Sequence, residues 1–286
     1  MDTTHLEPTR NVAIVSSAGA GKTSLSEAML YVAGATPMLG SVMHGTTVSD
    51  FEPEELRHRT STSTSLLQFT WNHTNINLID PPGALDLLGE SLAALQAADA
   101  VILILNETMG VRTELARLWT RIKELDLPSL VFVNGLDKED ASFEKTLEIC
   151  RKQLDCVPLP MTVVLNYGMS LDSIVDVRHE KIVRSGPSSA AVEHLLVPPS
   201  LEGMLNRARQ QLVEAVAESG ENLLETYLTQ GELSQEDLMQ GLRRDIQTKQ
   251  FLPIYGGSAT HNVGVWSLLD AIVALLPSPS ERGAAH

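Results

Sequence analysis

Residues 16–24 hold the feature that most restricts the fold, a glycine-rich loop that contains Gly21-Lys22-Thr23. An apolar run at 11–15 precedes the loop and a helical pattern at 25–32 follows it, as in a phosphate-binding loop. Free backbone N–H groups and the positive end of the helix dipole face an anion at such a place. The strict motif begins with glycine, and Ser16 occupies that position. The loop residues expected to bind phosphate groups are Ser16, Ser17, Ala18, Gly19, Ala20, Gly21, Lys22, Thr23 and Ser24.

Four of these residues have distinct expected roles. Gly19 and Gly21 let the backbone wrap closely around phosphate groups, because glycine adopts conformations that other residues resist. The Lys22 ammonium would reach the β- and γ-phosphates of a nucleotide, and the Thr23 hydroxyl would ligate Mg²⁺. Taken alone, the same residues also suit a glycine-rich helix start without a ligand, so the rest of the sequence has to decide.

Three more motifs follow in order, each after a short apolar run typical of a buried strand. They are Asp80-Pro81-Pro82-Gly83, Asn134-Gly135-Leu136-Asp137 and Ser258-Ala259-Thr260. In this arrangement the Asp80 carboxylate would hold a Mg²⁺-bound water, and the Gly83 N–H would sense a γ-phosphate. An Asp-Pro-Pro-Gly sequence also suits an ordinary turn. The four motifs together favour a guanine-nucleotide site.

The second and third of these motifs are expected to choose the base. The Asp137 carboxylate, next to Asn134, would accept hydrogen bonds from the N1–H and 2-amino groups of guanine. Adenine lacks this pair of donors, so ATP would leave a buried carboxylate unpaired. Ser258 and Ala259 are expected to contact the same base. An ATP-using enzyme is therefore the weakest of the possible interpretations.

An acidic, hydroxyl-rich stretch lies between the loop and Asp80. Residues 50–55 hold four carboxylates, and every residue from 60 to 65 is serine or threonine. One interpretation is a solvated polar loop. The other is a switch segment in which one hydroxyl completes the Mg²⁺ shell when a γ-phosphate is present. We favour Ser61 as that ligand, with the adjacent Thr60 and Thr62 as the alternatives.

Composition excludes some partners. The chain of 286 residues suits one large domain or two coupled ones. Its net charge of −15 argues against naked nucleic acid as a partner, because phosphate backbones require a basic surface. Cys150 and Cys156 match no zinc or redox motif, as expected for a reduced, cytoplasmic protein. No signal peptide or long apolar span is evident, so we expect no membrane association.

The order of the predicted elements indicates the fold class. Apolar strand-like runs alternate with helical patterns in the first half, which predicts an α/β, P-loop NTPase fold with a doubly wound, mostly parallel sheet. The 121 positions between Asp137 and Ser258 exceed what one helix and one strand require. We therefore expect an inserted α/β subdomain at 154–250, and a GTP-binding G domain formed by 1–153 and 251–286.

The expected insertion contains both kinds of element. Strand-like runs at 161–165 and 173–177 open it, and helical patterns follow. Ser234 and Asp237 form a capping-box pattern before an apolar helix face. The main sheet is expected to resume at 251–255.

These motifs support a family resemblance. Over residues 11–279, the chain resembles the nucleotide-binding domain of elongation factor G, a translational GTPase. Residues 134–137 resemble that family's Asn-Lys-x-Asp motif, and several stretches within 258–279 resemble its closing helix. Residues 221–228 resemble part of that factor's insertion. Residues 45–50 are closer to a divergent branch, the elongation factor G-like proteins.

The resemblance implies an activity and partners. A protein of this kind binds GTP or GDP with Mg²⁺ and hydrolyses GTP to GDP and phosphate. It also docks near the ribosomal stalk, with the insertion as a contact surface. Because the net charge is −15 and like charges repel ribosomal RNA, we expect weak ribosome binding by this chain alone.

The differences from the family concentrate at the chemistry. Ala84 stands where the family has the histidine that positions the attacking water, which leaves the catalytic residue unknown. Gly135 replaces the lysine of Asn-Lys-x-Asp, Pro81 replaces a threonine, and Gly19 replaces the loop aspartate. Together these changes predict weakened affinity and slow hydrolysis. The alternative is a pseudo-GTPase, a folded binding module that acts by presenting its surface to a partner.

Overall fold

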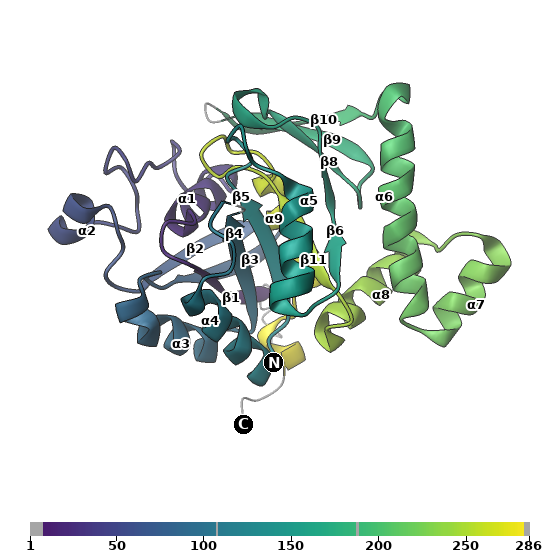
Figure 1. The fold of residues 1–286 in the computed structure, drawn as a ribbon, viewed down its shortest axis with the longest axis horizontal. Coiled ribbons are helices and arrows are strands. Elements are labelled where there is room, and N and C mark those ends of the chain that lie inside the picture. The colour runs from purple at the N-terminus through teal and green to yellow at the C-terminus, as the bar shows by residue number, and fades with distance from the viewer. Residues whose placement is uncertain (1–7, 107, 187–188, 283–286) are drawn as a thin grey trace, which may run out of the picture.

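The computed structural model describes residues 8–106, 108–186 and 189–282 (Figure 1). Within these residues, seven strands form one sheet in the order β2-β3-β1-β4-β5-β11-β6. In that order the strands are β2 (Ser65–Trp71), β3 (Thr74–Asp80), β1 (Thr9–Ser16), β4 (Ala100–Asn106), β5 (Ser129–Asn134), β11 (Leu252–Gly256) and β6 (Pro158–Pro160). Every neighbouring pair is parallel except β2 with β3, which forms an antiparallel hairpin. The predicted α/β fold with a mostly parallel sheet is confirmed.

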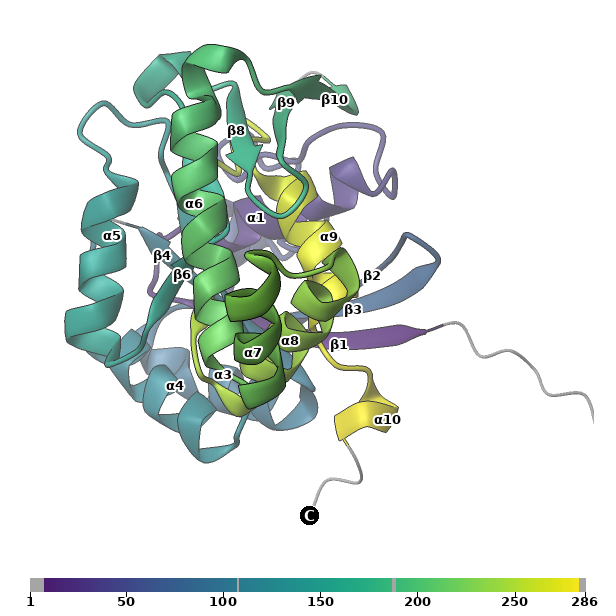
Figure 2. The same ribbon diagram turned by 90° about the vertical axis from the view of Figure 1, so that its right-hand side faces the viewer.

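The central strands are buried on both faces, which explains why they are continuous apolar runs. Along β1, Val12 and Ile14 point into one core, and Ala13 and Val15 point into the other. Helices α1 and α9 cover the first face, and α3, α4 and α5 cover the second (Figure 2). Their bounds are α1 (Lys22–Val32), α3 (Leu88–Ala97), α4 (Thr113–Glu124), α5 (Phe143–Ile149) and α9 (Val265–Leu275). The result is a three-layer α/β sandwich.

A second, antiparallel sheet of four strands packs at one end of the main sheet, in the order β10-β9-β8-β7 (Figure 1). Three helices follow it in the chain. The elements are β7 (Thr162–Val164), β8 (Ser173–Asp176), β9 (Lys181–Gly186), β10 (Ser189–Leu196), α6 (Pro199–Glu218), α7 (Glu221–Gln230) and α8 (Gln235–Thr248). The expected strands at 161–165 and 173–177 correspond to β7 and β8. Strand β6 belongs to the main sheet, although it lies within the expected range of the insertion. The domain bounds themselves stay a prediction.

The remaining described elements are short. They are α2 (Pro53–His58), α10 (Pro279–Arg282), 3-10 turns at Leu85–Leu87 and Gly168–Ser170, and a π turn at Cys150–Leu154. The Ser234 hydroxyl accepts a hydrogen bond from the Asp237 N–H, as its predicted cap role requires. Across residues 8–106, 108–186 and 189–282, no helix is long and apolar enough to cross a membrane.

One buried cluster fastens the second sheet to helix α9. The Asp270 carboxylate accepts hydrogen bonds from Arg178 and, at 2.9 Å, from Asn72 Nδ2 in the β2–β3 turn. His179 lies 3.1 Å from Asp176 and 3.3 Å from Asp270. These two carboxylates raise the pKa of His179 to about 9, so its imidazole is charged at neutral pH. The segment after β8 and the β2–β3 turn thus both bind to Asp270 of α9.

Candidate nucleotide-binding site

The four sequence motifs meet at one edge of the main sheet. Strands β1, β3 and β5 end at Ser16, Asp80 and Asn134, and β11 ends two residues before Ser258. Because these strands are parallel, their carboxyl ends lie together. Ligands of open α/β sheets bind in the crevice at that edge. The topology therefore brings residues far apart in sequence to one place.

The phosphate loop has a backbone that glycine permits and other residues resist. Gly19 and Gly21 have φ angles of +78° and +94°. A Cβ at Gly21 would lie only 2.1 Å from Asn134 Nδ2, so a larger residue there would have to displace the Asn134 amide. Helix α1 begins directly after Gly21, with its free N–H groups at the loop. The backbone is thus compatible with the predicted phosphate-binding role of this loop, which stays a prediction.

Lys22 and Asp80 form a buried ion pair at the bottom of the loop. The Lys22 ammonium donates to Asp80 Oδ1 at 2.7 Å, and the two side chains are 6% and 2% exposed. Ser26, one helical turn after Lys22, donates to Asp80 Oδ2 at 2.8 Å. Burial of such a pair removes two charges from water, and good geometry with extra hydrogen bonds offsets that free-energy cost. These contacts tie helix α1 to the end of β3.

A cavity of about 350 Å³ opens above this pair. The phosphate loop forms one wall, and the segment before β2 forms the other. Its lining residues include Ser16, Ser17, Ala18, Gly19, Gly21, Lys22, Thr23, Ser24, Val42, Met43, Arg59, Thr60, Ser61 and Gly83. We call residues 40–65 the switch segment. The cavity has the size of a small-molecule site and lies where the sequence predicts phosphates.

Of the three candidate hydroxyls in the switch segment, Ser61 is the one beside Thr23. Ser61 Oγ lies 3.1 Å from Thr23 Oγ1 and donates to Asp50 Oδ1 at 2.7 Å. Thr60 and Thr62 are both exposed, whereas Ser61 is buried. The favoured assignment of Ser61 as a metal ligand is thus compatible with the fold, and it stays a prediction.

Buried carboxylates surround Ser61. Burial raises the pKa of Asp50, against the opposing effect of the hydrogen bond from Ser61. Glu55 accepts hydrogen bonds from the N–H groups of Thr62, Ser63 and Glu52. Burial would raise the pKa of Glu55, but these hydrogen bonds outweigh it and leave the pKa below its ordinary value. Glu55 is therefore a charged acceptor that shapes the loop after Ser61.

Asn134 connects the phosphate loop to the Ser258-Ala259-Thr260 motif. Its Nδ2 donates to the Ala20 carbonyl at 2.9 Å, and its Oδ1 accepts from the Ala259 N–H at 2.9 Å. Asp137 is half-buried and, within the described part of the chain, its carboxylate has no hydrogen-bond or ion-pair partner. Ser258 is fully buried beside Ala259. Asn134 and Ala259 are thus hydrogen-bonded to each other, and all four residues expected to hold the base lie outside the lining of the cavity.

The segment after Asp80 contains the main departure from the expected chemistry. Gly83 lies against the loop, because a Cβ there would be 3.3 Å from Ala18 Cα. Ala84 is half-buried and precedes the 3-10 turn at Leu85–Leu87. Its methyl group has no atom that could hydrogen-bond to water.

Sequence reasoning missed three polar residues that organise the site. Ser26 and Glu27 lie on α1, and Asn106 ends β4 beside Gly135. The sequence contained a signal for Glu27, a carboxylate within the mostly apolar helical pattern at 25–32. Because a buried carboxylate almost always has a partner, its position could have predicted a polar contact. Asn106 had a weaker signal, as a polar residue at the end of an apolar run.

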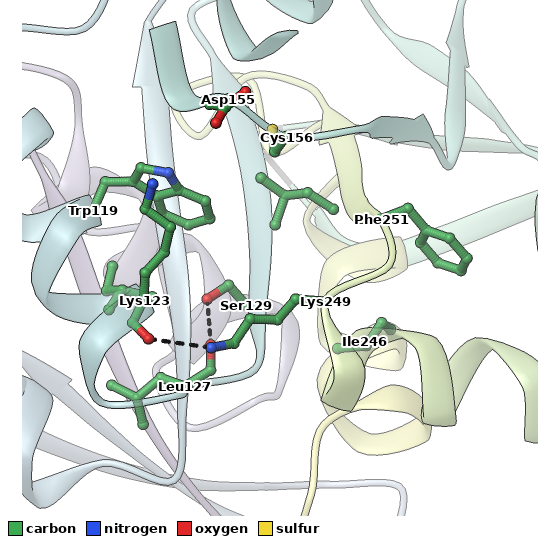
Figure 3. A pocket seen from close by; sticks show the side chains of 11 residues that line it. Trp119, Lys123, Leu127, Ser129, Asp155, Cys156, Ile246, Lys249 and Phe251 are labelled. Atoms are coloured by element: carbon green, nitrogen blue, oxygen red, sulfur yellow. Dashed lines mark hydrogen bonds between the residues drawn. The ribbon is translucent and has the colours of Figure 1, made fainter. Parts of the chain in front are cut away.

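A smaller cavity, of about 100 Å³, lies at the opposite edge of the sheet (Figure 3). Trp119 and Lys123 of α4 form one side and Phe251 the other, and the Lys249 ammonium donates to the Lys123 carbonyl. This cavity is near the start of β5, away from the four motifs. It is also too small for a nucleotide.

Comparison with known proteins agrees with this geometry. Residues 7–278 match the sequence profile of the elongation factor Tu GTP binding domain. The chain belongs to the translational GTPase family. The motifs predicted a resemblance to elongation factor G, and the match to this family confirms that prediction.

A solved structure supports the same family assignment. A crystal structure of a protein from Thermus thermophilus is similar, with 35% sequence identity and a TM-score of 0.87. The similarity covers 97% of this chain and 41% of that chain. This translational GTPase domain therefore spans less than half the length of that relative.

Proposed function

We propose that this chain binds GTP and GDP together with Mg²⁺ and hydrolyses GTP slowly to GDP and phosphate. The observation that carries the proposal is the buried Lys22–Asp80 pair at the bottom of a cavity walled by the phosphate loop and the switch segment. Water would attack the γ-phosphate, and catalysis would consist mostly of positioning and charge neutralisation.

The residues present suit Mg²⁺. Thr23 and Ser61 are proposed as direct ligands and Asp80 as a ligand through water. Two observations support this set: Thr23 Oγ1 and Ser61 Oγ lie 3.1 Å apart, and Asp50 accepts a hydrogen bond from the Ser61 hydroxyl. Mg²⁺ favours such oxygen donors combined with substrate phosphates and waters. When bound, it would neutralise charge that develops on the phosphates.

The protein's own groups would do the rest. The Lys22 ammonium would move from Asp80 toward the β- and γ-phosphates, and the loop N–H groups would hold their oxygens. The Gly83 N–H would donate to the γ-phosphate. Asp137 would accept from guanine, while Asn134 would keep the loop and Ala259 in register. Ala84 offers no group to orient the attacking water, so hydrolysis is expected to be slow.

A pseudo-GTPase is the second candidate function. In that case the domain would hold GDP, GTP or no nucleotide, and would act through a partner surface. Ala84 and Gly135 favour this alternative because both lack the side chains that the family uses. Where the domain binds GTP, the two proposals differ in one measurable quantity, the release of phosphate from bound GTP.

Calorimetric titration with GDP, GTP and ATP, each with and without Mg²⁺, tests the binding proposal. We expect saturable binding of GDP and GTP, tighter with Mg²⁺, and no binding of ATP. Absence of binding for both guanine nucleotides would refute it. Equal affinity for ATP would show that Asp137 does not select the base.

We also propose that this chain alone binds ribosomes weakly and does not support translocation. The net charge of −15 opposes association with RNA, and the screening length of roughly 10 Å at moderate salt limits that repulsion to close approach. Co-sedimentation with a non-hydrolysable GTP analogue is the test. Tight, GTP-dependent pelleting at physiological salt would contradict this proposal.

A further inference from the structure

Helix α1 carries a buried carboxylate that the proposed chemistry does not use. Glu27 lies four residues after Thr23 and is 0% exposed. Its Oε1 accepts from the Val48 N–H at 2.7 Å, and from the N–H and hydroxyl of Ser49 at 3.3 and 3.4 Å. Within the described residues no cation pairs with it, and its second oxygen has no partner. Burial raises its pKa, which reflects the cost of placing this group there.

The contacts of Glu27 lead directly to the candidate metal ligands. Ser49, which Glu27 holds, precedes Asp50, and Asp50 accepts the hydrogen bond from Ser61 at 2.7 Å. Ser65 adds a second tie, because its hydroxyl donates to the Ser49 carbonyl at 3.0 Å. Helix α1 therefore contacts the switch segment twice, through Thr23 at its first turn and through Glu27 one turn later. The second contact holds the backbone directly before Asp50, the residue that accepts the hydrogen bond from Ser61.

Gly40 leaves the space that the Glu27 side chain occupies. A Cβ at Gly40 would lie 2.0 Å from Glu27 Oε2 and 2.7 Å from the carboxyl carbon. The backbone of Gly40 does not need a positive φ, so the main consequence of a larger residue there would be displacement of the Glu27 side chain. The start of the switch segment thus fits closely over the carboxylate.

We propose that Glu27 is a positioning residue that fastens the switch segment to helix α1 and so sets Ser61 beside Thr23. This inference rests on the proposed function, because its main consequence concerns nucleotide binding. Ser61 is expected to act only when a γ-phosphate is present. Loss of the Glu27 contact should therefore weaken binding of a GTP analogue much more than binding of GDP.

Four variants separate this role from simple loss of structure. Glu27→Ala removes the acceptor, and Glu27→Gln keeps one side-chain oxygen that can accept the same hydrogen bonds. Gly40→Ala displaces the carboxylate without changing it. Gly203→Ala is the matched control, because its Cβ would enter open space on α6.

Calorimetric titration with GDP and with a non-hydrolysable GTP analogue, both in Mg²⁺, gives the first readout. For Glu27→Ala and Gly40→Ala we expect about a tenfold or larger loss for the analogue, since hydrogen bonds to charged groups contribute about that much. GDP affinity should stay close to that of the parent. Glu27→Gln should recover most of the loss. Equal losses for both nucleotides, or no loss in either variant, would overturn the proposal.

Trypsin digestion of the nucleotide-free chain gives a second readout that needs no nucleotide. Arg57 and Arg59 are exposed in the switch segment and are potential cleavage sites. Glu27→Ala and Gly40→Ala should be cleaved there faster than the parent and faster than Glu90→Ala. Glu90 is a fair comparison because it accepts from Thr64 of the same segment, at 2.6 Å, but lies at the surface.

The two experiments distinguish failure of the proposed function from failure of the positioning proposal. If the parent binds no nucleotide, the proposed function fails, and cleavage at Arg57 and Arg59 still tests the contact. If the parent binds and cleavage is unchanged in both variants, the positioning proposal is wrong. If circular dichroism shows that Glu27→Ala is unfolded, Gly40→Ala decides.

Discussion

The two halves of the nucleotide site differ in how far they depend on the fold. In the half expected to hold phosphates and base, the polar side chains also connect elements: Lys22 joins α1 to β3, and Asn134 joins the phosphate loop to Ala259. In the half expected to orient water, Ala84 is half-buried, and its methyl side chain has no polar atom that could connect two elements. Replacing Lys22 or Asn134 would therefore disturb the fold, whereas residue 84 can change at little structural cost.

This contrast suggests how such a domain can lose one ability and keep another. Binding arises from many contacts that stabilise one another, so it persists while the sheet edge persists. Orientation of the attacking water depends on a single positioned group, which typically contributes about 10²–10⁴-fold. A domain of this kind can thus keep the ability to bind nucleotide while it turns nucleotide over slowly.

The largest expected effect is that of Lys22→Ala. It leaves the Asp80 carboxylate buried without its cation, which should lower the free energy of unfolding by about 3 kcal/mol. Nucleotide affinity should fall by at least about tenfold, or about 1.4 kcal/mol. Chemical denaturation and calorimetry measure the two effects. Lys152→Ala, at an exposed lysine, is the control; unchanged stability and affinity in Lys22→Ala would refute the double role of Lys22.

Asp137→Asn should change base preference with little effect on the fold. The amide would lose the charge-assisted hydrogen bonds to guanine, so GTP affinity should fall by about a hundredfold, or about 2.7 kcal/mol. XTP should then bind better than GTP. Competition binding with the two nucleotides measures this, with Asp140→Asn as the control for the lost charge. An unchanged preference would mean that Asp137 does not contact the base.

Gly135→Ala should cost stability and should not improve binding. Gly135 has a φ of +83°, and a Cβ there would lie 2.9 Å from Asn106 Nδ2. We expect a loss of about 1–2 kcal/mol in unfolding free energy. Gly34→Ala, at a φ of +73° with open space around it, isolates the cost of the backbone angle alone. If the two losses are equal, Asn106 does not restrict residue 135.

The smallest expected effect is that of Ala84→His. The backbone at Ala84 is extended, with φ −73° and ψ 141°, so a histidine can be accommodated. In the isolated chain, phosphate release should rise by less than about tenfold, because a positioned group reaches its full effect only in an ordered active site. A larger rise is expected only if a ribosome engages the domain. No rise under either condition would favour the pseudo-GTPase.

Much of the fold could be predicted because its main strands are buried on both faces and read as apolar runs. Strands β1 and β5 were predicted for this reason, from the apolar runs at 11–15 and before Asn134. Strand β6 was not, because Pro158 and Pro160 make it atypical, and it lies at the sheet edge where proline is tolerated. Strands β9 and β10 pair only with neighbours in a half-exposed sheet, so no single run identified them.

The candidate site likewise contains residues that the sequence could identify and residues that it could not. Motif residues such as Lys22 can be recognised from the spacing of their neighbours in the sequence. Glu27 and Asp50 act through contacts with residues 11 to 22 positions away. Those contacts depend on the path of the switch segment, which has little regular structure and no periodic pattern. The adjacent hydroxyls could be ranked only once that path was known.

Single-turnover hydrolysis by a preformed complex tests the central claim most directly. The parent chain is loaded with one equivalent of GTP and Mg²⁺, freed of excess nucleotide, and sampled for bound nucleotide and released phosphate. We predict a stoichiometric complex that releases phosphate more slowly than about 10⁻³ s⁻¹, the range of an unstimulated GTPase. Failure to form the complex, or phosphate release at about 1 s⁻¹ or faster without any partner, would contradict the account.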